Sequence, residues 1–325
     1  MVSGKCKVTS GQTSEDAHIT PVHRPVLLRE VTEFLDVRPE GFYIDSTVGG
    51  GGHAEAIAER LTTGRLLGID RDPLALAAAR ERLARFGPKV TLVHGNFAEI
   101  DRLQAETSFP PADGVVADLG LSSMQLADST RGFSFNAEGP LDMRADPASE
   151  TTAADIVNYA SERELADLIF KFGEERHSRR IARAIMKARP IRTSTSLAQV
   201  VTRAIPSRPG LHQIHGATRT FMALRMAVNH ELENLEQFLS RVLAVMPPDG
   251  RLVVIGFHSA EDRVTKRAFS AWKQERRVRV LTPKPVRPGE NELRENPRAR
   301  SAKLRAIQKQ PQPAVAVAAL YERRP

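Results

Sequence analysis

The chain has 325 residues, of which 41% are hydrophobic and 26% charged, a size typical of about two domains. Its mean hydropathy is −0.32, and no apolar run approaches the roughly 18 residues of a membrane-spanning helix, which excludes that class. A single cysteine, Cys6, excludes an internal disulfide and a cysteine-rich zinc site. Because the first residues show no secretory signal pattern, we expect a cytoplasmic protein.

The net charge of +8 is unevenly distributed along the chain. Residues 171–219 and residues 271–325 each carry a net charge of +9, so the rest of the chain carries −10. Concentrated positive charge is typical of proteins that bind a polyanion, most often nucleic acid. Solvated helix faces and a basic tail would produce the same composition.

Residues 1–21 are predicted to form a disordered leader, rich in Ser, Thr, Gly and Lys. Strands and helices then alternate. Apolar spacing predicts helices over residues 26–36, 53–61 and 73–86, and strands over 42–45, 65–70, 90–94 and 114–118. This alternation indicates a parallel, doubly wound sheet.

After residue 118 the alternation stops. A loop over 119–150 precedes helices near 151–158, 161–171, 174–188 and 196–204, and a long helix is predicted from about 218 to 245. A strand over 251–257 and a helix over 260–274 resume the first pattern, and 278–281 and 302–307 are candidate late strands. We therefore expect an α/β, Rossmann-like domain (22–125 and 218–310) with an all-helical insertion (126–217) that serves substrate or RNA, and a tail (311–325).

A glycine-rich loop joins the first strand to the next helix. It reads DSTVGGGGH over residues 45–53, and Gly49-x-Gly51-x-x-Ala54 fits a dinucleotide-binding spacing. Asp70 ends the second strand 21 residues after Gly49, where an acid accepts hydrogen bonds from ribose hydroxyls. Loop, acid and strand context together indicate a cofactor that contains adenosine.

Both NAD and S-adenosylmethionine contain adenosine. Asp45 and Asp118, each at the end of a strand, are poorly placed beside a pyrophosphate but well placed for an ammonium or sulfonium cation. Asn96 and Phe97 follow the third strand and offer an amide and a ring to adenine, although Phe97 would equally suit the core. The acids favour S-adenosylmethionine.

Ten stretches of the chain resemble the bacterial MraW/RsmH methyltransferases and occur in that family's order. They are HRPVLLRE (23–30), DSTVGGGGH (45–53), GIDRDP (68–73), DGVVADLGLSS (113–123), RGFSF (131–135), GPLDMR (139–144), GEER (173–176), ATRTF (217–221), FHSAED (257–262) and NPRARS (296–301). The resemblance implies methylation of N4 of a cytidine in the decoding region of small-subunit ribosomal RNA. It also implies a Rossmann-like methyltransferase domain with a helical insertion.

The resemblance further implies a set of cofactor contacts, all of whose residue types are retained here: Gly51, Gly52, His53, Asp70, Phe97, Asp118 and Gln125. One departure is Met222, which stands where the family usually has glutamine and so loses an amide that might contact RNA. We expect no metal site, and we interpret His212-x-x-His215 as a surface loop or an RNA contact.

The target amino group is a weak nucleophile, because its lone pair is delocalised into the cytosine ring. Asp118 is the candidate group that accepts its N–H, although its role could be cofactor binding alone. The hydroxyls of Ser122 and Ser123 could orient the base or cap the loop. Further candidate substrate or RNA contacts are Arg131, Arg144, Arg219, His258, Arg298 and Arg300.

Two other functions are consistent with parts of this pattern. The glycine spacing alone would suit an NAD-dependent oxidoreductase, and the basic segments alone would suit a non-catalytic RNA-binding factor for ribosome assembly. Small-subunit ribosomal RNA is the expected partner, no membrane is expected, and a homodimer is a further option.

Overall fold

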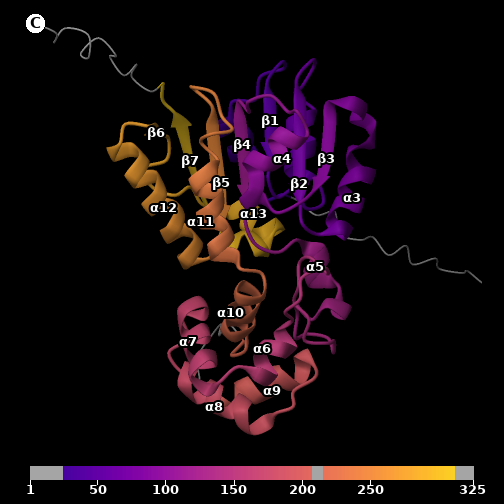
Figure 1. Ribbon diagram of the computed structural model, residues 1–325, viewed down its shortest axis with the longest axis vertical. Coiled ribbons are helices and arrows are strands. Elements are labelled where there is room, and N and C mark those ends of the chain that lie inside the picture. The colour runs from indigo at the N-terminus through magenta and orange to yellow at the C-terminus, as the bar shows by residue number, and fades with distance from the viewer. Residues whose placement is uncertain (1–24, 207–214, 312–325) are drawn as a thin grey trace, which may run out of the picture.

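The computed structural model describes residues 25–206 and 215–311. The predicted leader, His212 and all but the first residue of the predicted tail lie outside these ranges. The described chain forms two lobes, a larger one built on a sheet and a smaller one made of helices (Figure 1).

Seven strands form the sheet of the larger lobe, in the order β3-β2-β1-β4-β5-β7-β6. Strands β1 to β5 pair in parallel, whereas β7 pairs antiparallel with both β5 and β6. The strands are β1 (Phe42–Asp45), β2 (Arg65–Asp70), β3 (Val90–His94), β4 (Gly114–Asp118), β5 (Arg251–Gly256), β6 (Val278–Val280) and β7 (Lys303–Lys309). The predicted α/β fold is confirmed, and both candidate late strands are present.

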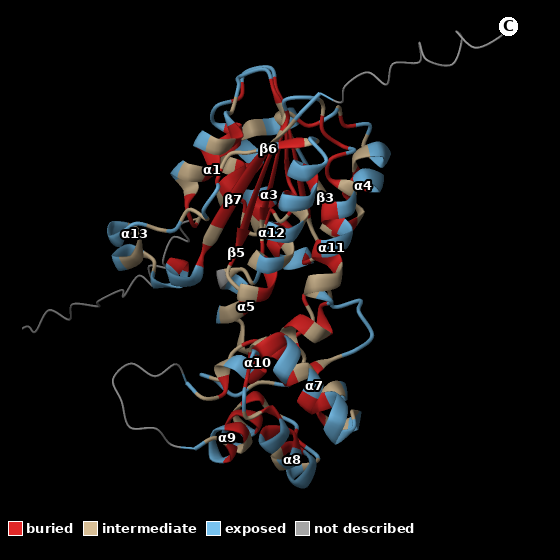
Figure 2. Ribbon diagram, turned by 90° about the vertical axis from the view of Figure 1, so that its left-hand side faces the viewer, coloured by how far each residue is buried: buried red, intermediate tan, exposed pale blue. Residues whose placement is uncertain are grey.

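Helices cover both faces of this sheet (Figure 2), so the inner strands β1, β2, β4, β5 and β7 are largely buried, whereas the edge strands β3 and β6 are partly exposed. One face packs against α1 (Leu28–Leu35), α2 (Gly52–Ala58) and α3 (Pro73–Leu83). The other packs against α4 (Ile100–Glu106), α11 (Glu231–Arg241) and α12 (Ser259–Gln274). Side chains alternate along each strand, so Val116 of β4 enters the first core while Val115 and Ala117 enter the second.

Short helices complete the larger lobe. The 3-10 segments η1 (Ala84–Lys89), η2 (Phe97–Glu99) and η4 (Pro297–Ser301) follow α3, β3 and α13 (Glu290–Glu295) respectively. The sequence pattern predicted neither α4 nor α13, because each is under eight residues long and presents few apolar side chains at helical spacing.

The smaller lobe has its own hydrophobic core. Its elements are α5 (Ser123–Ala127), η3 (Ser129–Arg131), α6 (Ala153–Tyr159), α7 (Glu162–Gly173), α8 (Ser178–Ala188), α9 (Ser194–Ala204) and α10 (Thr218–Val228). Leu165, Ile181 and Val201 are fully buried in this core, from α7, α8 and α9. The core also contains Phe221 and Leu224 of α10.

The predicted single helix over residues 218–245 is wrong. It is two helices, because α10 ends at Val228 and α11 begins at Glu231 after His230, whose φ of 49° lies in the left-handed region. Since α10 packs in the core of the smaller lobe, we place the return to the sheet lobe after Val228 rather than at residue 218.

Asn229, between these two helices, ties the lobes together. Its side-chain amide donates to the carbonyl of Met143 at 2.7 Å and accepts from the N–H of Ala145 at 2.8 Å. Its own carbonyl accepts from the guanidinium of Arg71 and from the side chain of Asn234, both at 2.9 Å. One buried residue thus joins the loop that contains Met143 and Ala145, the residue after β2 and the first turn of α11.

In the described part of the chain, no helix is both long enough and apolar enough to cross a membrane.

We expect Asn229→Ala to lower the free energy of unfolding by roughly 2–4 kcal/mol, because it leaves the buried groups of Met143 and Ala145 without partners. Urea unfolding followed by circular dichroism measures this change. Glu236→Ala, on the exposed face of α11, is the control and should change stability by under about 0.5 kcal/mol. Equal effects of the two substitutions would contradict the role of Asn229 as the joint.

Candidate functional site

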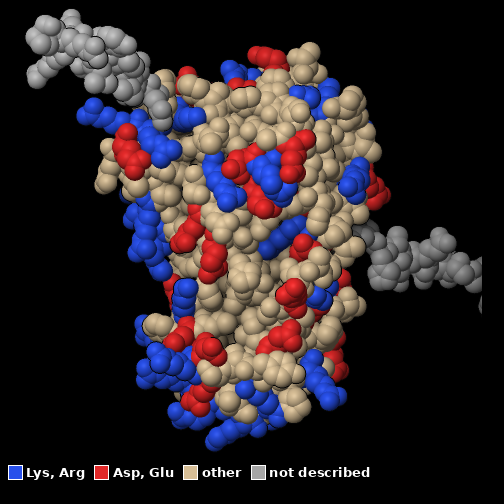
Figure 3. Space-filling view, in the orientation of Figure 1, with Lys and Arg blue, Asp and Glu red and all other residues tan. Residues whose placement is uncertain are grey.

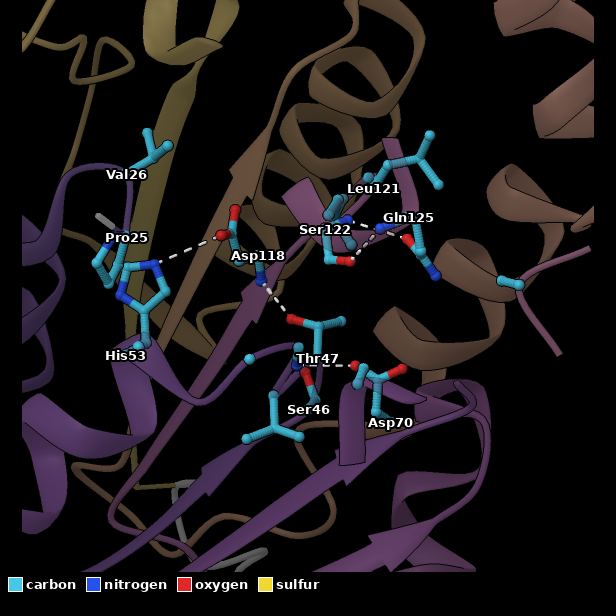
Figure 4. A pocket seen from close by; sticks show the side chains of 18 of the residues that line it. Pro25, Val26, Ser46, Thr47, His53, Asp70, Asp118, Leu121, Ser122 and Gln125 are labelled. Atoms are coloured by element: carbon cyan, nitrogen blue, oxygen red, sulfur yellow. Dashed lines mark hydrogen bonds and ion pairs between the residues drawn. The ribbon is translucent and has the colours of Figure 1, made fainter. Parts of the chain in front are cut away.

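A pocket opens at the carboxyl ends of the parallel strands (Figure 4). Its walls are the loops after β1, β2, β3, β4 and β5, together with Pro25 and Val26 before α1 and Asn296 and Arg298 near η4. This is the edge where ligands bind in open α/β sheets, because the loops there diverge and leave a crevice.

The glycine loop forms one wall. Gly49 and Gly51 have φ values of 50° and 82°, which residues with a side chain adopt only with backbone strain. A Cβ atom on Gly52 would lie 2.3 Å from Cγ of Pro25. Gly52 and His53 line the pocket, whereas Gly51 is not among the lining residues. A Cβ atom on Gly51 would lie 3.4 Å from Leu83 and 3.5 Å from Ala79 of α3.

Asp70 lies at the end of β2 and faces the pocket. Its carboxylate accepts the N–H of Gly49 at 2.8 Å and the N–H of Asp72 at 2.9 Å, so it fixes the glycine loop against β2. Burial raises the pKa of Asp70 above its ordinary value, although these two N–H groups oppose the change. The position fits the predicted ribose contact.

Asp45, His53 and Asp118 form a buried group beside the loop. Nε2 of His53 lies 3.5 Å from Oδ2 of Asp118, and Figure 4 shows the two side chains directed at each other. Among the described residues, Oδ2 of Asp45 and Oδ1 of Asp118 are buried without a hydrogen-bond partner. Such acceptors are suited to a cationic or hydrogen-bond-donating ligand.

The ionisation of this group responds to its burial. Burial raises the pKa of Asp45 to about 7, partly opposed by the charge of His53. Burial also lowers the pKa of His53, but the carboxylates of Asp118 and Asp45 outweigh it and raise that pKa above its ordinary value.

Phe97 follows β3 and both lines the pocket and packs against the core. Its ring centroid lies 5.3 Å from that of Phe238 on α11. The side chain of Asn96 accepts the N–H of Ala98 and donates to Asn234, each at 3.0 Å. Asn96 therefore positions Phe97 from behind rather than presenting its amide to the pocket.

Gln125 and Ser122 hold the loop after β4. They form a capping box at the start of α5, in which Ser122 Oγ accepts the N–H of Gln125 and the side-chain oxygen of Gln125 accepts the N–H of Ser122. The amide of Gln125 also donates to the buried carboxylate of Asp72 at 2.7 Å. Ser122 thus serves as a cap, and its neighbour Ser123 is described only as the first residue of α5.

Arg131 has an intramolecular role that the motif did not indicate. Its guanidinium pairs with Asp72 at 2.5 Å and donates to the carbonyls of Arg144 and Ala145. Its side chain is only 11% exposed and that of Asp72 only 1%. Arg131 therefore offers little surface to RNA.

The other basic candidates differ in their surroundings. Arg144 binds both carboxylate oxygens of Asp142 at 2.8 Å and holds the pKa of Asp142 below its ordinary value. Arg219 is half exposed, 3.6 Å from Glu175. Arg298 and Arg300 are exposed on η4, and Arg298 also lines the pocket mouth.

His258 lies between the lobes, and its ring contacts Met222 of α10 rather than lining the pocket. Burial, reinforced by the charge of Arg225, lowers the pKa of His258 to about 4. The ring is therefore neutral near pH 7.

Sequence patterns missed several pocket residues: Thr47, Arg71, Glu231 and Glu261. Thr47 Oγ1 accepts the N–H of Asp118 at 2.7 Å and so fixes the end of β4. Glu261 lies within the FHSAED motif, which could have indicated it as a site residue. Glu231 carries no such signal, because it reaches the pocket only through the turn of the chain at His230. Within residues 25–206 and 215–311, no cluster of His, Cys, Asp or Glu could hold a metal ion.

The sequence is similar to that of several known proteins. Residues 20–310 match the model of the MraW methylase family. The "Ribosomal RNA small subunit methyltransferase H" of Koribacter versatilis (strain Ellin345) is 51% identical over 293 residues, which are 87% of this chain and 93% of that protein. The protein of the same name from Gloeobacter violaceus is 52% identical over 288 residues, 88% of each chain.

We expect Arg131→Met to destabilise the protein by about 3–5 kcal/mol, because it leaves the carboxylate of Asp72 buried without its charged partner. Denaturant unfolding measures the change. Arg300→Met is the matched control on the surface and should have almost no effect on stability. If Arg131→Met unfolds at the wild-type denaturant concentration, the structural role of Arg131 is refuted.

Asp45 should make stability depend on pH. Its pKa is raised from 3.8 to about 7 on folding, so folding favours the protonated form. The free energy of unfolding is therefore not reduced by Asp45 below about pH 4, and Asp45 lowers it increasingly as the pH rises from about 4 to about 7. Without ligand, Asp45→Asn should gain more stability over wild type at pH 8 than at pH 5, measured by urea unfolding. A gain that is equal at both pH values would contradict this.

Proposed function

The chain belongs to the MraW methylase family, and we propose that it transfers the methyl group of S-adenosylmethionine to small-subunit ribosomal RNA. The accepting atom is N4 of a cytidine in the decoding region, as the resemblance of the sequence motifs implies. We expect the reaction to take place in the cytoplasm.

The observation that carries this proposal is the buried acidic wall beside the glycine loop. Oδ2 of Asp45 and Oδ1 of Asp118 have no partner in the described structure, and neither oxygen is reached by solvent. A sulfonium and an ammonium would compensate their charge, whereas a pyrophosphate would be repelled by it. The residues therefore fit S-adenosylmethionine better than NAD.

The remaining pocket residues match the other parts of this cofactor. We expect Asp70 to contact the ribose, Phe97 the adenine ring, and the backbone of Gly49, Gly50 and Gly52 to allow close approach of the ligand. Bound there, S-adenosylmethionine carries an electrophilic methyl group on a positively charged sulfur. The chain contributes alignment of the methyl group with the attacking nitrogen, which is the main requirement of an in-line displacement.

A basic face supports an RNA substrate. Helix α8 carries exposed Arg179, Arg180 and Arg183, and α12 carries exposed Arg263 and Lys266. Figure 3 shows Lys and Arg side chains along the left-hand side of both lobes in this view. The ion pair of Arg263 with Glu174, at 2.9 Å, links α12 to the end of α7. We infer that this face binds the phosphate backbone, so that binding weakens as salt rises. We favour this face over Arg131 and Arg144 as the RNA contact, because both of those side chains are paired within the protein.

Small ribosomal subunits purified from a strain that lacks this protein should accept label from S-adenosylmethionine when the protein is added. Mass spectrometry should locate the label on N4 of a single cytidine. Absence of label from the ribosomal RNA would refute the proposal, and binding of NADH without binding of S-adenosylmethionine would favour an oxidoreductase.

Asp70→Ala should weaken S-adenosylmethionine binding roughly 10- to 100-fold, because the ribose loses a charged acceptor and the glycine loop loses its anchor. Calorimetry measures the dissociation constant. Asp101→Ala, on the exposed side of α4, is the control and should bind as wild type does. Full methylation in cells by Asp70→Ala would instead favour a non-catalytic assembly factor.

A further inference from the structure

Glu261 is a buried carboxylate in the pocket wall. It follows β5, the strand that pairs with β4, at whose end Asp118 lies. It belongs to the first turn of α12, directly after β5, and is only 2% exposed. Strands β4 and β5 pair in parallel with Asp118 opposite Ile255, so both carboxylates lie at the same edge of the sheet. Asp70 ends β2 and Phe97 follows β3, so Glu261 lies on the far side of Asp118 from the two residues proposed to contact the adenosine.

The two oxygens of Glu261 have different surroundings. Oε2 accepts the N–H of Phe257 at 2.9 Å and the N–H of His258 at 3.0 Å. Both of these backbone contacts are made by Oε2 and neither by Oε1. A Cβ atom on residue 256 would lie 3.3 Å from Cβ and 3.4 Å from Oε2 of Glu261, so Gly256 leaves room for the carboxylate against β5. The backbone therefore fixes Oε2, and because Glu261 lines the pocket, we take Oε1 as the oxygen that a ligand would contact.

Charged groups from both lobes surround this carboxylate. Arg225 of α10 pairs with Glu231 of α11 at 2.8 Å, so its positive charge is already largely neutralised. Burial raises the pKa of Glu261 to about 7; the charge of Glu231 adds to this and that of Arg225 opposes it. His258, just before α12, is neutral near pH 7, and Asp118 adds negative charge from the end of β4. A carboxylate in this setting takes up and releases a proton near neutral pH.

We propose that Oε1 of Glu261 accepts a hydrogen bond from the exocyclic amino group of the target nucleobase and then takes the proton that this nitrogen loses. The proposal rests on the proposed function, since it requires a base amino group as methyl acceptor. Glu261 is then the catalytic base, and the pocket wall around it, with Phe257 and Gly120, is the subsite for the flipped base.

The proton balance requires such a group. The amino nitrogen forms a bond to the methyl carbon as the carbon–sulfur bond breaks, and the electron pair of that bond stays on sulfur. The nitrogen, now positively charged, releases one proton to Oε1, and the neutral methylated base remains. A base whose pKa lies near the working pH is the most effective acceptor.

Asp118 is less suited to this step than the sequence suggested. Its Oδ2 is directed at His53, at 3.5 Å, on the side of the glycine loop (Figure 4). Asp118, His53 and Asp45 therefore act together on the cationic part of the cofactor. This assigns cofactor binding to Asp118 and proton transfer to Glu261.

Helix capping is the other role that Glu261 could have, because its position is the third in α12 and its carboxylate accepts the N–H of the residue that precedes the helix. Glutamine at this position completes the same capping box but is not a base. Glu261→Gln therefore separates the two roles.

The test compares Glu261→Gln with wild type and with Glu236→Gln, an exposed control on α11. Single-turnover methylation of small subunits is measured at saturating S-adenosylmethionine, with cofactor affinity from calorimetry and the unfolding midpoint as separate readouts. We expect Glu261→Gln to slow methyl transfer roughly 100- to 1,000-fold. Cofactor affinity should stay within twofold of wild type, and the unfolding midpoint should be retained.

The wild-type enzyme provides a second measurement that needs no variant. Because Glu261 acts in its ionised form, the single-turnover rate should rise about tenfold per pH unit below pH 7 and level off above it. A flat profile between pH 5.5 and 8 would overturn the proposal, as would a Glu261→Gln variant that transfers methyl at the wild-type rate. Loss of cofactor binding in that variant would also overturn it. If the wild-type enzyme itself leaves ribosomal RNA unlabelled, the proposed function has failed instead.

Discussion

Burial of negative charge at one edge of a parallel sheet is the constraint on which the rest of this structure depends. Asp45, Asp70, Asp118 and Glu261 all lie at this edge and all are removed from bulk water to a large degree. Burying carboxylates is unfavourable unless hydrogen bonds or cations compensate them. Backbone N–H groups compensate Asp70 and one oxygen of Glu261, while Asp45 and Asp118 keep unpartnered oxygens. The free protein thus retains an unfavourable arrangement, which the proposed binding of a cationic methyl donor would relieve.

The same edge is where the two lobes meet, so cofactor and substrate sites share their supports. Asp72 caps α3 and also accepts from Gln125 and Arg131, which belong to the chain leading into the insertion. Asn229 likewise holds the two lobes together where the chain passes from α10 back to the sheet lobe, because its side chain bonds the backbone of Met143 and Ala145. The insertion is therefore held to the pocket at both of its crossings by buried polar contacts. A displacement of the smaller lobe would disturb the residues behind the glycine loop.

Two kinds of carboxylate chemistry follow from small differences in position. Asp118 has one oxygen, Oδ2, 3.5 Å from His53 and the other, Oδ1, buried without a partner, and the latter suits a cationic or hydrogen-bond-donating ligand. Glu261 lies near Arg225, which is already paired with Glu231, and Glu261 lines the pocket after β5, the strand next to that of Asp118. Neighbouring acids with different surroundings can therefore divide cofactor binding from proton transfer.

The sequence by itself determined the parallel strands and the edge of the sheet at which the pocket opens. The predicted bounds of β1 to β4 match the structure, because buried strands carry local apolar runs and the loops that follow carry local glycines and acids. Tertiary structure alone decided which charged residues are free. Arg131 and Arg298 both belong to motifs of the family, yet Arg131 is buried against Asp72 while Arg298 is exposed at the pocket mouth. It also decided the turn at His230, which no glycine or proline announces, and the placement of Glu231 and Glu261 in one pocket. Such contacts join residues far apart in the chain, so no local pattern of residue types can encode them.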